Sequence, residues 1–95
     1  MVKTRSFDSA EDLDGPEGIA EYLSDALATN DAAFIAQAIG TAARARGMTE
    51  IAREAGVSRE NLYRSLSGQT KPEFDTILRV LTALGVQLSA TTKVA

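Results

Sequence analysis

The sequence predicts an all-α domain of about five helices that ends in a short β-strand. Apolar residues recur at i, i+3, i+4 and i+7 over most of the 95-residue chain, and this is the spacing of a buried helix face. Residues that commonly begin or end helices stand between these apolar runs. Only after Gly85 does the apolar spacing change to every second residue, as in a half-buried strand.

The first two predicted helices are long. The first begins at Asp14 and Pro16, where a carboxylate and a fixed proline φ can organise the first turn, and it stops at residues 29–30. The second spans about residues 31–46, and Gly40 within it suits close helix packing. The residues that these two helices are expected to bury are Ile19, Tyr22, Leu23, Ala26, Leu27, Phe34, Ile35, Ala38, Ile39 and Ala42.

Two short helices follow. Thr49 can cap a helix of about two turns that ends at Ala55, and Ser58 can cap another that reaches about Ser67. Residues 67–71 are then predicted to form a loop.

The last helix is expected to open at Pro72 and to end at Gly85. Its expected buried residues are Phe74, Ile77, Leu78, Leu81 and Leu84. The predicted strand follows, because Val86, Leu88 and Ala90 alternate with polar residues. A single strand leaves backbone groups unpaired, so we expect a second copy of the chain to pair with it.

Charge divides the chain into two parts. Residues 1–31 hold two basic and eight acidic side chains, a net of −6, whereas residues 32–95 hold eight basic and five acidic ones, a net of +3. The two parts should therefore prefer different partners. We predict an N-terminal arm over residues 1–13 and a single domain over residues 14–95.

Composition excludes several function classes. The chain has no Cys and no His, which removes thiolate nucleophiles, imidazole bases, disulfides and nearly every zinc site. Glu50 and Glu54 form a pair at i, i+4 that is more typical of a helix surface than of catalysis. We therefore expect no enzyme, no cofactor and no metal. No signal peptide or membrane span is evident, which indicates a cytoplasmic protein without a membrane partner.

Residues 48–67 have the pattern of a helix-turn-helix. Two short helices that cross steeply need a small contact residue and a corner that tolerates positive φ, and Ala52 and Gly56 meet these needs. The apolar contacts expected on either side of the corner are Ile51, Ala55, Val57, Leu62 and Leu66. The residues left to point outward, toward the DNA major groove, are Ser58, Arg59, Glu60, Tyr63, Arg64 and Ser67.

Each outward residue has two possible roles. Arg59 and Arg64 are predicted to contact bases or phosphates, the alternative being solvated surface charge. Glu60 either accepts a hydrogen bond from a cytosine amino group or pairs with Arg64 at i+4. Tyr63 either lies partly in the core or donates to a phosphate.

Further candidates flank this face. Thr49, with the first amides of its helix, is suited to hold a phosphate as well as to cap the helix. The loop residues Gln69, Thr70 and Lys71 are placed to reach backbone phosphates. Arg44 and Arg46 lie near the end of a helix, where they complement its dipole, so we assign them a structural role.

Several stretches of the chain resemble a known group of proteins. Residues 7–8, 19–23, 43–49, 72–78, 83–85 and above all Gly-Val-Ser-Arg-Glu-Asn-Leu-Tyr-Arg-Ser-Leu-Ser-Gly at 56–68 are similar to Xre or lambda-repressor-like helix-turn-helix proteins, and among them to HigA-like antidotes of addiction modules. The resemblance implies an antitoxin. Such a protein binds and neutralises a RelE/HigB-like toxin and represses the shared operon by binding double-stranded operator DNA.

A homodimer follows from the size of one recognition helix. Two copies placed one DNA turn apart, roughly 34 Å, double the contacts, and we expect the seam at the predicted strand or the last helix. The acidic residues 8–31 either cover the basic surface of an RNA-cleaving toxin or simply aid solubility. Two other functions stay open: an Xre-like regulator without a toxin, and a protein-binding adaptor that has lost DNA affinity.

Overall fold

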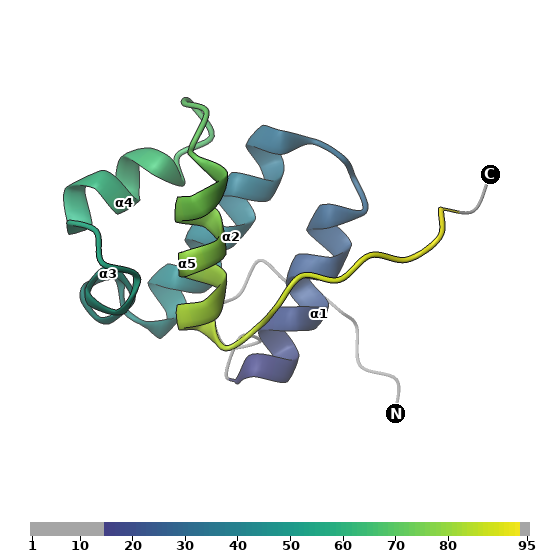
Figure 1. The fold of residues 1–95 in the computed structure, drawn as a ribbon, viewed down its shortest axis with the longest axis horizontal. Helices are drawn as coiled ribbons and strands as arrows, with labels where there is room; N and C mark the ends of the chain where they lie inside the picture. Colours follow the sequence, from purple (N-terminus) through teal and green to yellow (C-terminus); the bar gives the residue numbers. More distant parts are fainter. Residues whose placement is uncertain (1–14, 94–95) are drawn as a thin grey trace.

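A computed structural model describes residues 15–93, and within them the chain folds into five helices. These are α1 (Pro16–Leu27), α2 (Ala32–Arg46), α3 (Met48–Ala55), α4 (Arg59–Ser65) and α5 (Phe74–Leu84). Figure 1 shows α1 on one side of α5 and the short helices α3 and α4 on the other, with α2 running behind α5 toward α3. The prediction of about five helices is confirmed. The predicted arm and the predicted cap at Asp14 lie outside the described residues.

Local hydrogen bonds explain where the first two helices end and begin. The Thr29 hydroxyl donates to the carbonyl oxygen of Ala26 at 2.7 Å, and Asn30 takes a left-handed φ of 56°, so α1 stops where the sequence predicts. One carboxylate oxygen of Asp31 accepts from the Phe34 N–H at 3.2 Å and caps α2. This bond satisfies one of the amides that a helix start leaves free.

All five helices contribute to one apolar core. The largest fully buried side chains are Ile19, Ile51, Leu62, Val80 and Leu84, and no polar or charged side chain in residues 15–93 is buried. Ile19 comes from α1, so this acidic helix is part of the core and not an appendage to it. The core fixes the positions of α3 and α4 against the longer helices.

Several residues that the sequence places in the core are exposed. Phe74 is 65% exposed, Phe34 48%, Leu78 40% and Leu27 39%. Helical periodicity identifies the apolar side of each helix, but the apolar stripes of α1, α2 and α5 are wider than the area that the other helices of the same chain cover. The prediction that these side chains are buried is therefore wrong for the chain as described.

The predicted C-terminal strand is also wrong. Residues 86–93 form no strand with any described part of the chain, and Figure 1 shows them leaving the helical body as an extended tail. The Val86 N–H donates to the carbonyl oxygen of Leu81 at 3.0 Å and so closes the end of α5. A strand requires a neighbouring strand to pair with, and residues 15–93 offer none.

Candidate nucleic-acid interface

A tight corner joins α3 to α4. Gly56 has a φ of +77°, which favours glycine, and the next N–H, that of Val57, donates back to the Ala52 carbonyl at 3.0 Å. Ala52 is 3% exposed. The guanidinium of Arg79 on α5 donates to the Ala55 carbonyl at 3.4 Å and braces the corner from outside. Ala52 and Gly56 thus have the small size and the positive φ that the sequence predicts for them.

The two predicted caps have different outcomes. The Ser58 hydroxyl accepts from the Asn61 N–H at 3.0 Å, which confirms it as the cap of α4. The prediction that Thr49 caps α3 is wrong. Only Gly47 separates α2 from α3, so α3 begins at Met48 and Thr49 lies inside its first turn, where its side chain makes no capping bond. Thr49 is exposed there and stays a predicted phosphate contact.

The inner face of α4 is buried: α4 packs on α3, and its C-terminal end approaches α2. Leu62 is 0% exposed and Leu66 is 3% exposed. A Cβ added to Gly40 would come within 3.1 Å of the Leu66 carbonyl oxygen, so this glycine allows α2 to approach the end of α4. The predicted role of Gly40 in close packing is confirmed, and the packing determines which side of α4 faces outward.

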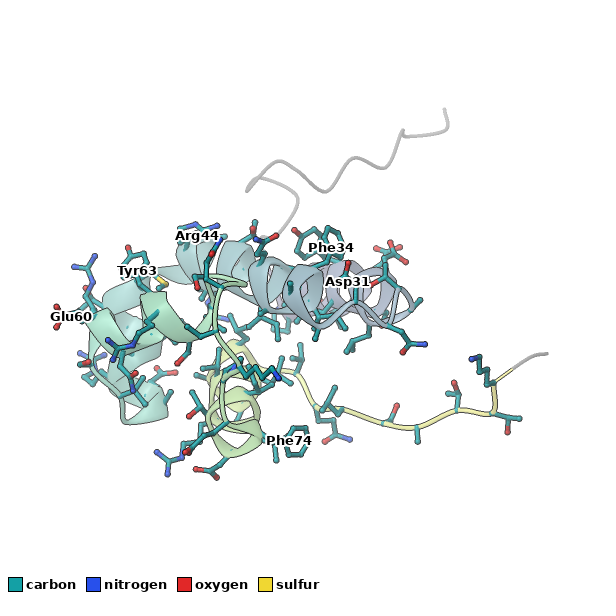
Figure 2. All side chains as sticks on the ribbon, turned by 90° about the horizontal axis from the view of Figure 1, so that it is seen from above. Asp31, Phe34, Arg44, Glu60, Tyr63 and Phe74 are labelled. Carbon is teal, nitrogen blue, oxygen red and sulfur yellow. The ribbon has the colours of Figure 1, made fainter. Side chains whose placement is uncertain are left out.

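The outer face of α4 carries the predicted contact residues. Ser58, Arg59, Glu60, Tyr63 and Arg64 are all exposed. Figure 2 shows Glu60 and Tyr63 at the end of the molecule away from Asp31. The structure thus brings these five predicted residues together on one short helix and its cap.

Two side chains on this face support each other. The Arg59 guanidinium donates to the Tyr63 hydroxyl at 3.2 Å and lies 5.6 Å from the centre of the Tyr63 ring. This distance allows a cation–π contact. Tyr63 is 42% exposed, so it belongs to the surface more than to the core. The pair restricts the freedom of the long arginine side chain before any ligand binds.

Glu60 and Arg64 do not pair with each other. The Arg64 guanidinium instead donates to the side-chain oxygen of Asn61 at 3.2 Å. Within the described residues the ion pairs are Arg53 with Glu50 and Arg79 with Asp75, each at 2.9 Å. The Glu60 carboxylate is thus available as a hydrogen-bond acceptor on the outer face.

The loop after α4 is held by hydrogen bonds to the end of that helix. The hydroxyls of Ser67 and Thr70 both donate to the Arg64 carbonyl, at 2.9 and 3.0 Å. The Ser67 hydroxyl also accepts from the Gln69 N–H at 3.0 Å. Ser67 is half-buried and engaged inside the loop, whereas Gln69 and Lys71 are exposed. Of the predicted contacts here, Gln69 and Lys71 are the better placed to reach a ligand.

Sequence reasoning missed one residue that shapes this loop. The Gln37 side-chain amide on α2 donates to the Ser67 carbonyl at 3.2 Å. Gly68 next to it has a φ of +84°, and a Cβ there would come 2.7 Å from the same amide nitrogen. A glutamine on the polar side of a helix carries no sequence signal for such a role.

The described residues keep the charge division of the whole chain. Residues 15–43 carry four exposed carboxylates, Glu17, Glu21, Asp25 and Asp31, and no basic side chain. Basic residues begin with Arg44, whose guanidinium donates to the Thr41 hydroxyl, and Arg46, which donates to the Leu84 carbonyl at 3.2 Å. Arg46 therefore ties α2 to the end of α5, in line with its predicted structural role.

The structure adds little for other classes of site. Residues 15–93 hold no group of three or more side chains suited to bind a metal ion. None of the helices in that range is long and apolar enough to span a membrane.

Comparison with known proteins identifies the family. Residues 3–92 match the model of a family described as "Probable addiction module antidote protein". The chain belongs to this family. It is also similar to an uncharacterised protein of Haemophilus influenzae, with 46% identity over 83 residues, which cover 87% of this chain and 86% of that protein. No solved structure matches the chain.

Membership of the antidote family confirms the predicted antitoxin class and implies a toxin partner in general terms. The kind of toxin, operator binding, and the dimer stay predictions.

Proposed function

We propose that this antidote is a cytoplasmic homodimer that binds and neutralises a RelE/HigB-like toxin and represses its own operon through the outer face of α4. The observation that carries the DNA-binding part is the division of α4 into two faces. Leu62 anchors the inner face in the core, while Arg59 and Arg64 stand on the exposed outer face. A short helix held in this way is narrow enough to enter the major groove.

In this proposal α3 and α4 act as a helix-turn-helix. Arg59 and Arg64 donate to base edges, for which a guanidinium facing guanine is the commonest specific pair, and Glu60 accepts from cytosine. Ser58 and Tyr63 lie at the edges of the same face, where their hydroxyls suit contact with the DNA backbone.

Phosphate contacts set the position of α4 in the groove. Thr49, Gln69 and Lys71 are exposed on either side of α4 and supply hydroxyl, amide and ammonium donors. Ser67 supports the loop from inside through its bond to the Arg64 carbonyl. These contacts carry no sequence information, but they contribute affinity that falls as salt rises.

The DNA-binding proposal is tested with a duplex from the region upstream of the gene, by fluorescence anisotropy at fixed salt. Arg59→Ala and Arg64→Ala should each weaken binding by about 1–3 kcal/mol, or roughly 5- to 150-fold. Lys93→Ala is the matched control, because it removes the same charge from the exposed tail. Unchanged affinity in both arginine variants would exclude groove reading by α4. A binding constant that does not vary with salt would favour the adaptor function.

The toxin-binding part rests on family membership and on the carboxylates of α1 and the start of α2. An RNA-cleaving toxin presents a basic surface to its substrate, and the exposed carboxylates of Glu17, Asp25 and Asp31 suit such a surface. The double variant Glu17→Gln, Asp25→Asn should slow capture of the toxin encoded by the adjacent gene. Glu54→Gln with Glu73→Gln, two exposed carboxylates outside α1 and α2, is the control of equal charge. Equal capture rates for the two variants would exclude this face.

One observation favours a regulator without a toxin as the second candidate. Ile19, Leu23 and Ala26 of α1 are buried in the core, so the helix stabilises the fold whether or not it binds a toxin. A pull-down of the chain with the product of the neighbouring gene separates the two functions: a stable complex supports the antitoxin, and its absence supports the regulator.

A further inference from the structure

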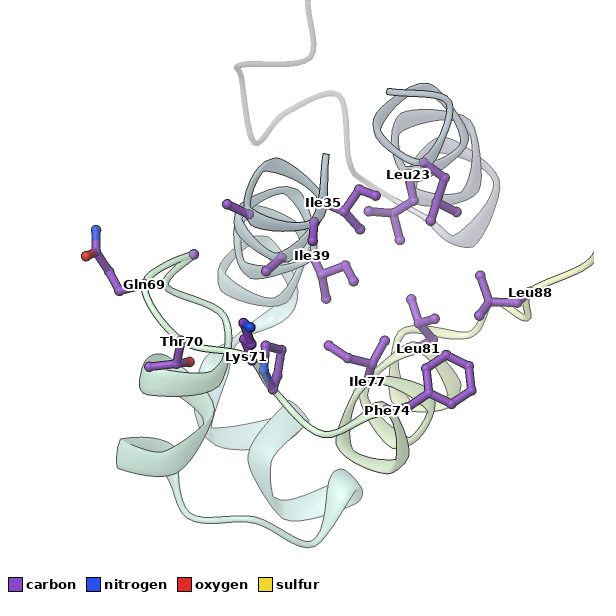
Figure 3. Close-up of a pocket in the computed structure, with 16 residues that line it drawn as sticks. Leu23, Ile35, Ile39, Gln69, Thr70, Lys71, Phe74, Ile77, Leu81 and Leu88 are labelled. Atoms are coloured by element: carbon purple, nitrogen blue, oxygen red, sulfur yellow. The ribbon is translucent and has the colours of Figure 1, made fainter. Parts of the chain in front are cut away.

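An open apolar groove of about 560 Å³ lies on the molecule between the α1–α2 pair and α5. Figure 3 shows Leu23, Ile35 and Ile39 on one wall, and Ile77 and Leu81 on the other. Residues 68–72 close one end, and Lys71 among them is the only charged residue of 15–93 that borders the groove. Exposing an apolar surface of this size to water is unfavourable in free energy, so such a surface commonly marks a binding site.

An apolar ridge stands directly beside the groove. Phe74 borders it and is 65% exposed, which is the largest exposure among the large apolar side chains in the described part of the chain. Leu78, one turn later on the same side of α5, is 40% exposed, and Leu88 at the start of the tail is 37% exposed and borders the groove too. The apolar ridge and the groove therefore lie next to each other on one face of the molecule.

We propose that this face is the seam of the homodimer, with Phe74 of each copy seated in the groove of the other. The inference rests on the dimer proposed above and names its surface. A two-fold interface uses the same patch on both copies, so that patch must be complementary to itself. A ridge beside a groove meets this requirement, because rotation by half a turn brings each ridge over the opposite groove.

Charge favours a second copy over a basic toxin as the occupant. Within residues 15–93 the groove offers no carboxylate to a basic partner, and Lys71 would repel such a partner. Leu23 lines the groove, whereas Glu21 and Asp25 are each two residues from it, or roughly 200° around the helix. The acidic side of α1 thus faces away from the groove. Asp31 at the start of α2 directly precedes Ala32 and Ala33, which border the groove, so the two surfaces meet there. A toxin held by the carboxylates of α1 would still leave the groove to a second copy.

The seam would also touch the DNA-binding side of the molecule. Residues 68–72 end the groove, and within them Thr70 donates to the Arg64 carbonyl at the end of α4. A second copy seated in the groove would contact the loop that carries the predicted phosphate donors Gln69 and Lys71. Dimer formation should therefore order this loop in addition to joining two recognition helices.

The seam is tested by sedimentation of two matched variants. Phe74→Asp places a charge on the ridge, and Phe34→Asp places the same charge on an exposed phenylalanine that Figure 2 shows on the other side of the molecule. The wild type and Phe34→Asp should sediment at about twice the chain mass of 10.1 kDa. Phe74→Asp should sediment as a monomer, with a dissociation constant raised at least about 30-fold. Equal circular dichroism spectra of all three proteins would show that folding is retained.

A second measurement locates the contact without a substitution. In a mixture of isotope-labelled and unlabelled chains, filtered nuclear Overhauser spectra should connect the Phe74 ring of one copy with the Ile35 and Ile39 methyls of the other. The proposed seam would be overturned by any of three results: a wild-type dimer without these signals, a Phe74→Asp protein that still dimerises, or a Phe34→Asp protein that is monomeric. A monomeric wild type would overturn both the seam and the dimer. If Phe74→Asp then also failed to capture the toxin, the groove would be a binding site for the toxin instead. Operator affinity of the arginine variants tests DNA binding independently of all these outcomes.

Discussion

The outer face of α4 and the groove beside α5 share one loop but have opposite chemistry. On α4 the exposed groups are two arginines, a carboxylate and hydroxyls, and the Arg59–Tyr63 hydrogen bond holds one arginine in place. The walls of the groove are mostly apolar, and among the described residues that line it only Lys71 bears a charge. The first surface suits a hydrated polyanion, and the second suits an apolar partner that excludes water.

The difference shows how a small chain can have two kinds of partner. With one core of five helices, the inner face of α4 and the walls of the groove depend on the same buried residues. The two outer surfaces can nevertheless be altered one at a time, because their exposed side chains do not overlap except in residues 68–71.

The largest effect is expected from a substitution in the core, because both surfaces depend on it. Leu62 is 0% exposed at the centre of α4. Leu62→Ala should lower the free energy of unfolding by about 2–5 kcal/mol, because it leaves a cavity beneath the outer face of α4. Urea unfolding measures this loss. Wild-type stability in the variant would mean that α4 is not anchored by its inner face.

The shared loop should show the next largest effect. Gly68→Ala adds a Cβ at a φ of +84° and 2.7 Å from the Gln37 amide nitrogen. We expect a loss of about 1–2 kcal/mol in stability from the left-handed φ. Operator binding should also weaken, because displacing the Gln37 side chain breaks its hydrogen bond to the loop. Gln37→Ala removes only the hydrogen bond to the loop and should cost about 0.5–1.5 kcal/mol. Thermal unfolding measures the stability of the two variants, and fluorescence anisotropy on the same samples measures their operator affinity. An equally stable Gly68→Ala protein would contradict the role given to this turn.

The two hydroxyls at the starts of α3 and α4 should behave differently. Ser58→Ala removes the bond to the Asn61 N–H and should cost about 1 kcal/mol of stability. Thr49→Ala removes no capping bond and should stay within about 0.5 kcal/mol of the wild type. Both variants should weaken operator binding if both hydroxyls reach the DNA. Equal losses of stability would mean that α3 also depends on a side-chain cap.

The smallest effect is expected at Tyr63. Tyr63→Phe keeps the ring beside the Arg59 guanidinium but removes the hydroxyl to which it donates. Operator affinity should fall by about 0.5–1 kcal/mol, while stability should hardly change because the bond is exposed. Anisotropy titration at fixed salt measures the change. A drop as large as that for Arg59→Ala would mean that the Tyr63 hydroxyl contributes far more than one contact to the DNA backbone.

The α3–α4 pair could be predicted from sequence because the rules that fix it are local. A serine three residues before Asn61 predicts its own capping bond, and a glycine at the corner predicts positive φ. The outward set on α4 follows from the positions of Leu62 and Leu66 by subtraction. Each of these inferences needs only neighbours within about one helical turn.

The groove half could not be predicted in the same way. The apolar spacing of Phe74 and Leu78 is the same whether a helix of this chain or a second copy covers them, so periodicity assigned them to the core. The strand at residues 86–90 failed for a related reason, since a period of two indicates an extended chain but supplies no strand to pair with it. Gln37 was missed because its partner is 30 residues away along the chain.

The most direct test of the claim that α4 reads DNA is a titration of the ¹⁵N-labelled protein with the operator duplex, followed by amide chemical shifts. The account predicts that the largest changes fall on residues 58–71, with α1 almost unaffected. Largest changes on α1, or an even spread over all five helices, would contradict it.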